Sequence, residues 1–227
     1  MPTDNPELKP EFWETRYQED TARWDLGHAA PPFTSLLKSK AAPSPGRLIA
    51  LGSGRGHDAL LFAEQGFEVL GVDFAPSAVA EARKLAIARQ LDAQFIQRDI
   101  FDLLSPSSDH PGSSSNSSND ASKPSFVGQF DYVLEHTCFC AIAPHQRPAY
   151  VDLVYRLLRP RGELIALFWA HSRDGGPPYG TSLDEIRDLF SPVFRTKVLE
   201  RATNSVESRH PDEYLGRFQK PVETALL

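Results

Sequence analysis

The residues best placed to do chemistry are a run of glycines and an acid, which lie between positions 47 and 73. An apolar run stops at Gly52-Ser53-Gly54-Arg55-Gly56, a helix-like stretch covers 58–65, and a second apolar run ends at Asp73. This spacing predicts a strand, a glycine loop, a helix, a strand and an acid in one βαβ unit. Glycines let backbone N–H groups approach a ligand closely. A carboxylate after the second strand can accept hydrogen bonds from both ribose hydroxyls of an adenosine.

The spacing of the glycines separates the ligands that such a loop can bind. A dinucleotide loop, G-x-G-x-x-G, would need its third glycine at His57, whereas this loop closes one residue earlier, at Gly56. No P-loop lysine follows the glycines. The tighter loop is typical of sites for S-adenosylmethionine, which has no phosphate to cradle. A tight turn without a ligand is the alternative, and the presence of Asp73 favours the cofactor.

Polar side chains also follow the third and fourth strands of the expected sheet. The third strand ends near Asp99 and Ile100, where the acid could accept a hydrogen bond from an adenine amino group or could cap a helix. The fourth strand runs into Glu135 and His136. Because open α/β sheets bind ligands outside the carboxyl ends of their strands, both side chains are expected at the site.

Three roles are open for His136. A neutral imidazole could take the proton of a thiol, because a thiol has a pKa near 8.5 and histidine one near 6.5. A protonated ring could instead attract an anionic acceptor. In the third interpretation the ring is only hydrogen-bonded to neighbouring backbone.

Aromatic residues near the N-terminus form a second candidate part of the site. Trp13 and Tyr17 are four residues apart, so a helix beginning at about Glu11 places both rings on one face. Trp24 opens a turn, and Pro31-Pro32 is expected to stiffen the exit from it. The segment could be an amphipathic helix that covers the sheet. It could also be a lid whose rings stabilise a sulfonium cation, by about 0.5–2 kcal/mol each. Both can hold at once.

The remaining patterns complete an α/β chain, with Ser77 expected as the N-cap of the second crossover helix. We expect further helices at 77–91, 150–158 and 182–190, and further strands at 93–96, 130–134, 163–169, 196–202 and 214–219, the last two as an antiparallel pair.

Composition limits the other classes of function. The segment 105–125 is serine-rich with almost no apolar residue, so it is expected to be a disordered insertion. The formal net charge of −6 implies no basic face and argues against nucleic acid as a partner. An apolar run of about 20 residues and an N-terminal signal pattern are both missing, so we expect no membrane association and a cytoplasmic location. Cys138 and Cys140 alone make a weak metal site, and packing is the expected role of both thiols.

A set of motifs in this order resembles one family. The motifs are FW-x-x-x-Y with WD-x-G, LGSGRGHD, GVD, RDIF, FCAI-x-P-x-x-R, LLRPRGELI and GGPPY. The chain resembles the thiopurine methyltransferase superfamily, most closely its thiol, thiocyanate and halide methyltransferase branch. The resemblance covers nearly the whole chain outside 105–125.

The resemblance implies an α/β fold of the class I S-adenosylmethionine-dependent methyltransferase (Rossmann-like) type. Residues 1–227 would form one domain with a seven-stranded sheet in the order 3-2-1-4-5-7-6, helices on both faces, and an N-terminal lid at 1–34. The implied cofactor-binding residues are Trp13, Tyr17, Trp24, Gly52, Ser53, Gly54, Asp73, Phe74, Asp99, Ile100 and Glu135, and the implied catalytic residues are His136 and Glu135.

The sequence departs from the family pattern at four of these positions. Ser53 stands where relatives usually have cysteine, and Tyr17 where they often have tryptophan. Glu135-His136 stands where plant relatives have aspartate-tyrosine and thiopurine enzymes have aspartate-arginine. Because this pair helps shape the acceptor pocket, the departure leaves the acceptor open.

The expected reaction is transfer of the methyl group of S-adenosylmethionine to a small soft nucleophile, a thiol or thiocyanate or halide. In-line displacement from a sulfonium needs alignment, which can lower a barrier by about 7–11 kcal/mol, and no metal is required. The expected protein is a monomer. Two alternatives stay open, a small-molecule O- or N-methyltransferase on the same fold and a protein that binds the cofactor without turnover.

Overall fold

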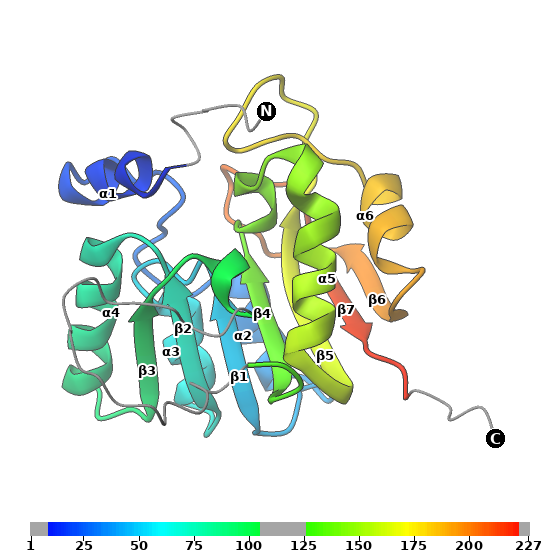
Figure 1. Cartoon of the computed structure of the whole chain (residues 1–227), viewed down its shortest axis with the longest axis horizontal. Helices are drawn as coiled ribbons and strands as arrows, with labels where there is room; N and C mark the ends of the chain where they lie inside the picture. The colour runs from blue at the N-terminus through cyan, green and yellow to red at the C-terminus, as the bar shows by residue number, and fades with distance from the viewer. Residues whose placement is uncertain (1–8, 105–125, 223–227) are drawn as a thin grey trace, which may run out of the picture.

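The computed structural model describes residues 9–104 and 126–222 and contains one seven-stranded sheet in the order β3-β2-β1-β4-β5-β7-β6 (Figure 1). Strands β1 to β5 run parallel, and β7 is antiparallel to both of its neighbours. The expected strand order and fold class are therefore confirmed. The strands are β1 (Arg47–Leu51), β2 (Glu68–Asp73), β3 (Ala93–Gln97), β4 (Phe130–His136), β5 (Leu158–Trp169), β6 (Arg195–Arg201) and β7 (Glu213–Gln219).

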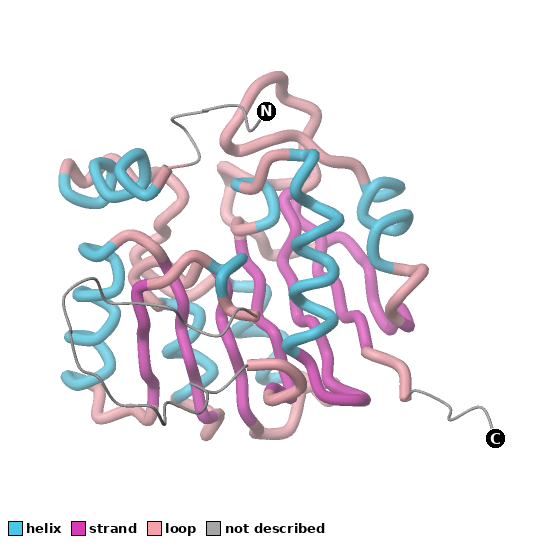
Figure 2. The backbone as a smooth tube through the Cα atoms, in the orientation of Figure 1, coloured by secondary structure: helices cyan, strands magenta, loops and turns pink. Residues whose placement is uncertain are grey.

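Helices cover both faces of this sheet, and each face has its own apolar cluster (Figure 2). One face packs against α2 (Pro31–Lys38), α3 (His57–Ala63) and α4 (Pro76–Ala88), and the other against α5 (Arg147–Leu157) and α6 (Leu183–Phe190). Helix α1 (Pro10–Gln18) lies beyond the carboxyl ends of the parallel strands, and the short turns η2 (Ile100–Asp102), η3 (Phe139–Ala141) and η4 (Pro144–Gln146) complete the chain. Along the described residues, no helix is both long and apolar enough to cross a membrane.

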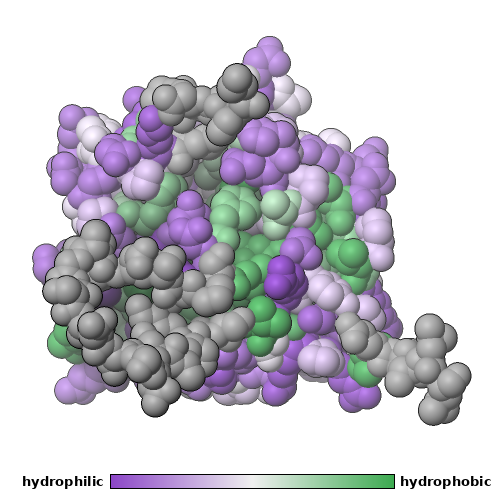
Figure 3. Space-filling model, in the orientation of Figure 1, coloured by the Kyte–Doolittle hydropathy of each residue, from purple (hydrophilic) through white to green (hydrophobic). Residues whose placement is uncertain are grey.

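The alternation of side chains along the central strands decides which residues share a face. In β5, Leu164 packs in the cluster on the α5 side, whereas Ile165 packs in the cluster on the α3 side. In β4, Val133 and Leu134 alternate in the same way. Because successive strand residues point to opposite faces, Glu135 lies on the α5 side and His136 on the α3 side. On the outer face that carries α5, hydrophobic residues gather near the centre, with polar residues around them (Figure 3).

Pro31-Pro32 follows the turn that Trp24 opens and begins α2, at positions where a helix needs no backbone N–H. One local expectation was wrong. Helix α4 begins at Pro76 with Ala75 as N-cap, so Ser77 is not the cap. Instead, the backbone N–H and hydroxyl of Ser77 donate to the carboxylate of Glu14 on α1, at 2.9 and 2.5 Å. A residue of α1 therefore supplies the acceptor for the start of α4. The segment 105–125 lies outside the described residues.

Candidate active site

The glycine loop leaves β1 with a backbone conformation that only glycine adopts easily. Gly52 and Gly54 have φ angles of +60° and +53°. A Cβ atom at Gly52 would lie 2.9 Å from the Cys138 sulfur, and one at Gly54 would lie 2.8 Å from the Tyr17 hydroxyl oxygen. Both the dihedral angles and the surrounding space therefore require glycine. The loop can consequently pack against η3 on one side and α1 on the other.

Asp73 ends β2 beside this loop and is nearly buried, with 6% of its surface exposed. One carboxylate oxygen accepts a hydrogen bond from the Gly54 N–H at 2.8 Å, and the other accepts one from the Ala75 N–H at 2.9 Å. Burial raises the pKa of Asp73, while these backbone donors oppose the rise. The Phe74 backbone is a third donor to this carboxylate, which has about four acceptor positions and therefore keeps room for a further donor. Ribose binding by Asp73 stays a prediction that this geometry allows.

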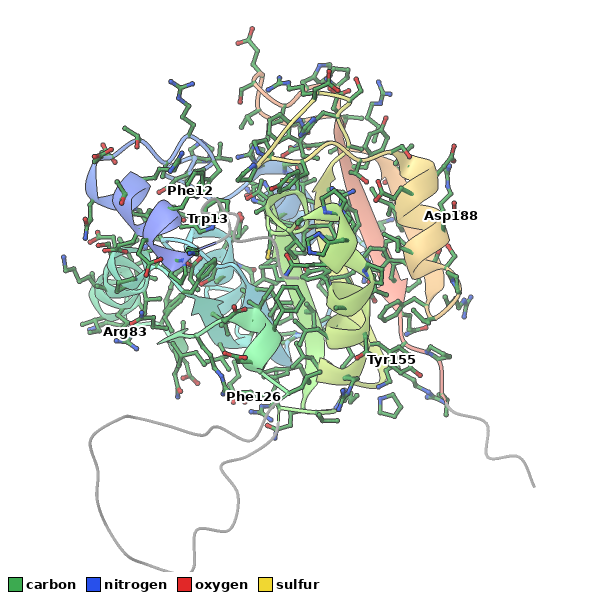
Figure 4. All side chains as sticks on the ribbon, turned by 45° about the horizontal axis from the view of Figure 1, so that its top comes forward. Phe12, Trp13, Arg83, Phe126, Tyr155 and Asp188 are labelled. Atoms are coloured by element: carbon green, nitrogen blue, oxygen red, sulfur yellow. The ribbon has the colours of Figure 1, made fainter. Side chains whose placement is uncertain are left out.

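The aromatic residues of the N-terminal segment gather over the glycine loop. The Trp13 and Trp24 rings are 5.0 Å apart, Phe74 lies 6.4 Å from Trp13, and the Trp24 indole N–H donates to the Tyr17 hydroxyl at 2.9 Å. Figure 4 shows Trp13 on α1, between that helix and the body of the domain. Arg55 of the loop holds the segment in place through ion pairs to Asp20 and Asp25 on the same N-terminal segment, at 3.1 and 3.0 Å.

The cleft between this aromatic group and the loop is narrow. Its volume is about 60 Å³, and its walls come from Tyr17, Trp24, the loop, His136 and Thr137. Sites for ligands of the size of S-adenosylmethionine span roughly 300–1,000 Å³. The glycine cradle, the Asp73 carboxylate and the aromatic rings fit the chemistry of S-adenosylmethionine. The lining of this cleft does not include the expected cofactor-binding residues Trp13, Asp73, Phe74, Asp99, Ile100 and Glu135.

Glu135 occupies the α5 side of this end of the sheet and is 1% exposed. Its Oε1 accepts a hydrogen bond from the Phe139 N–H at 2.8 Å. Among the described residues its Oε2 has no partner, and the same is true of the buried Tyr150 hydroxyl and Ser53 Oγ. Burial raises the pKa of Glu135 to about 7. The side chain is therefore close to half ionised at neutral pH and has one acceptor oxygen free.

His136 lies on the other face, in a cluster of charged side chains. Its Nδ1 is 2.6 Å from Asp58 Oδ2, and its Nε2 is 2.5 Å from Arg209 Nη1 and 3.4 Å from Glu213 Oε1. Burial lowers the pKa of His136, but the Asp58 and Glu213 carboxylates outweigh it and raise the pKa to about 9. In a protonated ring neither nitrogen has a lone pair. In a neutral ring Nδ1–H donates to Asp58, and the Nε2 lone pair accepts from Arg209.

This geometry bears on the roles that the sequence left open for His136. Neither protonation state leaves a nitrogen free to take a proton from an acceptor. The ring contacts side chains rather than neighbouring backbone, so the purely backbone interpretation is not what the structure shows. An electrostatic or positioning role is favoured over that of a base. A catalytic role for His136 stays a prediction.

The partners of His136 carry little signal in the sequence. Asp58 lies in the first turn of α3, two residues after the glycine loop, and its other oxygen accepts from the Ala30 N–H at 2.7 Å. Arg209, which is 3% exposed, also donates to the Trp24 carbonyl oxygen at 2.7 Å and to Glu213 at 3.1 Å. Arg209 lies in the connection between β6 and β7, which has no periodic pattern. The fold brings it under the N-terminal segment, 185 positions away from Trp24 in sequence.

Asp99, Ile100 and the two cysteines lie in surroundings that fit structural roles. Asp99 caps η2 by accepting from the Phe101 N–H at 2.9 Å, so the cap interpretation is confirmed, and adenine binding stays a prediction. Ile100 is 6% exposed and packs in the cluster on the α5 side. Both cysteines are free thiols. Burial raises the pKa of Cys140 to about 12 and that of Cys138 well above its usual value, so packing describes both better than reactivity.

The sheet order, the glycine loop after β1 and the acid at the end of β2 define the class I S-adenosylmethionine-dependent methyltransferase fold. Solved structures support this. One is the 1,6-didemethyltoxoflavin-N1-methyltransferase of Burkholderia thailandensis, with bound 1,6-didemethyltoxoflavin and S-adenosylhomocysteine. It has a TM-score of 0.70, is 18% identical, and is matched over 98% of this chain and 91% of its own. Another solved structure comes from work on the conversion of a disulfide bond into a thioacetal group during echinomycin biosynthesis. It has a TM-score of 0.73 and is 22% identical, and the match covers 95% of this chain and 93% of that chain.

Sequence comparison identifies the family within this class. The family model described as thiopurine S-methyltransferase matches residues 8–224. Thiocyanate methyltransferase 1 of Brassica oleracea is 31% identical over 212 residues, which cover 92% of this chain and 84% of that protein. A thiopurine S-methyltransferase of Legionella pneumophila is 21% identical over 219 residues, 90% and 89% of the two chains. The chain belongs to the thiopurine S-methyltransferase family, as the motifs indicated, and is an S-adenosylmethionine-dependent methyltransferase.

Proposed function

We propose that this methyltransferase acts on a small soft nucleophile that reaches the site as an anion, namely a thiolate, thiocyanate or a halide. The observation that carries the proposal is that neither protonation state leaves a His136 nitrogen free to act as a base, because Asp58 holds Nδ1 and Nε2 either accepts from Arg209 or carries a proton itself. A hydroxyl acceptor needs a placed base, whereas an anionic sulfur or halide needs none. The relation to thiocyanate methyltransferase 1 of Brassica oleracea supports the same class of acceptor.

Bound S-adenosylmethionine supplies an activated methyl group on a sulfonium. The task of the chain is therefore to bind, to align and to exclude water. Asp73 is proposed to hold the ribose, and the loop from Gly52 to Gly54 to lie under the methionine part. The rings of Trp13 and Trp24 are proposed to close over the sulfonium, where cation–π attraction stabilises it. The free Oε2 of Glu135 is proposed to accept from the cofactor's ammonium group.

One observation favours a second candidate. The Glu135 carboxyl group, with a pKa of about 7 and a free oxygen, has the properties of a general base. If it faced the acceptor rather than the cofactor, O-methylation of a hydroxyl would be feasible. The two candidates therefore differ in what Glu135 contacts.

The experiment is product analysis by mass spectrometry after incubation with S-adenosylmethionine. A small thiol, thiocyanate, iodide and catechol are offered in parallel, with Glu135→Gln as the matched variant. We expect methylated products from the thiol, thiocyanate or iodide and none from catechol. Methylation of catechol alone, lost in Glu135→Gln, would favour the second candidate. Cofactor binding without any methylated product from these acceptors would contradict both.

A further inference from the structure

A second cavity lies at the end of the sheet opposite the candidate active site. Its volume is about 540 Å³, and it is bounded by the loop between α2 and β1, the starts of β4 and β5, part of β6 and the end of β7. In Figure 1 this is the lower end of the sheet, whereas the glycine loop and α1 lie at the upper end. The two cavities have no lining residue in common.

The walls of this cavity carry an excess of positive charge. Its charged lining residues are Asp131, Arg159, Arg161, Glu163, Lys197 and Arg217. Four of these are cationic and two anionic, which leaves two positive charges in excess, in a chain whose formal net charge is −6.

The ion pairs inside the cavity do not neutralise it. Glu163 is 4% exposed and accepts from two cations, Lys197 at 2.8 Å and Arg217. Arg159 pairs with Asp131, yet its side chain is 61% exposed and its guanidinium has further donors for a ligand. Within the described part of the chain, the Arg161 guanidinium forms no ion pair.

The backbone fixes Arg161 at the rim of the cavity. Its φ angle is +69°, which is uncommon for a residue other than glycine. The Arg161 N–H donates to the Lys220 carbonyl oxygen at 3.1 Å, and its own carbonyl accepts from Gln219 Nε2 at 3.2 Å. Arg217 Nη1 donates to the Ala41 carbonyl oxygen at 2.7 Å, which holds the loop before β1 against β7.

We propose that this cavity is a binding site for a small oxyanion with two or more negative charges, of the phosphate or polycarboxylate class. The guanidinium groups of Arg159 and Arg161 present paired N–H donors that match two oxygens of such an anion, and Lys197 adds a point charge beside the buried Glu163. A cavity of this size accommodates an anion from phosphate to citrate. The site is separate from methyl transfer.

The test uses the full chain at constant ionic strength, with inorganic phosphate, sulfate and citrate titrated against a chloride control. Isothermal titration calorimetry should show one saturable site for at least one anion. The melting temperature should rise with its concentration, because the anion binds the native state. Saturating S-adenosylhomocysteine should leave this binding unchanged. The three probes also separate a phosphate preference from a carboxylate preference.

Variants decide whether the cavity is the site. Arg161→Gln and Arg159→Gln should each weaken anion binding about ten-fold, the effect of losing a charge-assisted hydrogen bond. Lys84→Gln removes the same charge from the exposed surface of α4 and should leave the affinity intact. Absence of saturable binding for all three anions would overturn the proposal. The proposal would also be overturned if Arg161→Gln and Arg159→Gln bound the anion as tightly as the Lys84→Gln control, or if S-adenosylhomocysteine competed with the anion.

Discussion

Replacement of Glu135 by glutamine should stabilise the protein at alkaline pH and weaken cofactor binding at the same time. The ordinary pKa of this carboxyl group is 4.5, and burial raises it to about 7 in the folded protein. The folded state therefore binds the proton more tightly than the unfolded state, so stability falls as pH rises through this window and is constant above it. A difference of about 2.5 pKa units corresponds to about 3 kcal/mol at pH 8 and to under about 1 kcal/mol at pH 5.

Glutamine resembles the protonated side chain and keeps an oxygen for the Phe139 N–H, so Glu135→Gln should avoid most of this cost. The measurement is urea unfolding of both proteins at pH 5 and pH 8, with Glu81→Gln on the surface of α4 as control. We expect the variant to gain stability relative to the parent only at the higher pH. Affinity for S-adenosylhomocysteine, measured by calorimetry, should fall about ten-fold through loss of a charged hydrogen bond. A stability difference that does not change with pH would refute the argument from burial.

Three further predictions follow from the same geometry. Asp73→Ala should weaken binding of S-adenosylhomocysteine by about 1.5–3 kcal/mol in calorimetry, and an unchanged affinity would exclude the ribose contact. Because the cleft beneath Tyr17 and Trp24 is narrow, saturation with S-adenosylmethionine should change tryptophan fluorescence, and an unchanged spectrum would show that the segment does not move. The pKa of His136, raised to about 9, implies stability that is complete below about pH 6.5 and lost as pH rises through 9. An NMR titration that gave His136 a pKa below 7 would contradict this prediction. If His136 is not the base, His136→Gln should leave intact the rise of kcat/KM with pH for a thiol acceptor.

Much of the fold could be predicted because local signals agreed with the global arrangement. The βαβ unit around the glycine loop combines continuous apolar runs with glycines at positions that need positive φ, and both features can be recognised from the residues themselves. The antiparallel pair β6 and β7 followed from alternation and from the short spacing between the two segments.

The errors concern contacts between segments distant in sequence. Ser77 has the side chain of an N-cap, but Glu14 from α1 is its partner and the helix begins one residue earlier. Arg209 belongs to a connection whose residues give no periodic signal, although the fold buries it beside His136.

The opposite orientations of Glu135 and His136 separate two functions that the sequence presents as one dipeptide. Glu135 faces the side of α5, where its free oxygen lies in a buried environment and its pKa is raised to about 7. His136 faces Asp58 and Arg209, and Arg209 in turn holds the Trp24 carbonyl. A substitution at position 136 therefore reaches the N-terminal aromatic segment through Arg209, whereas one at position 135 changes the buried contact with the Phe139 N–H directly. We therefore expect a substitution of His136 to alter how the N-terminal segment is held, through the Arg209 contact with the Trp24 carbonyl oxygen.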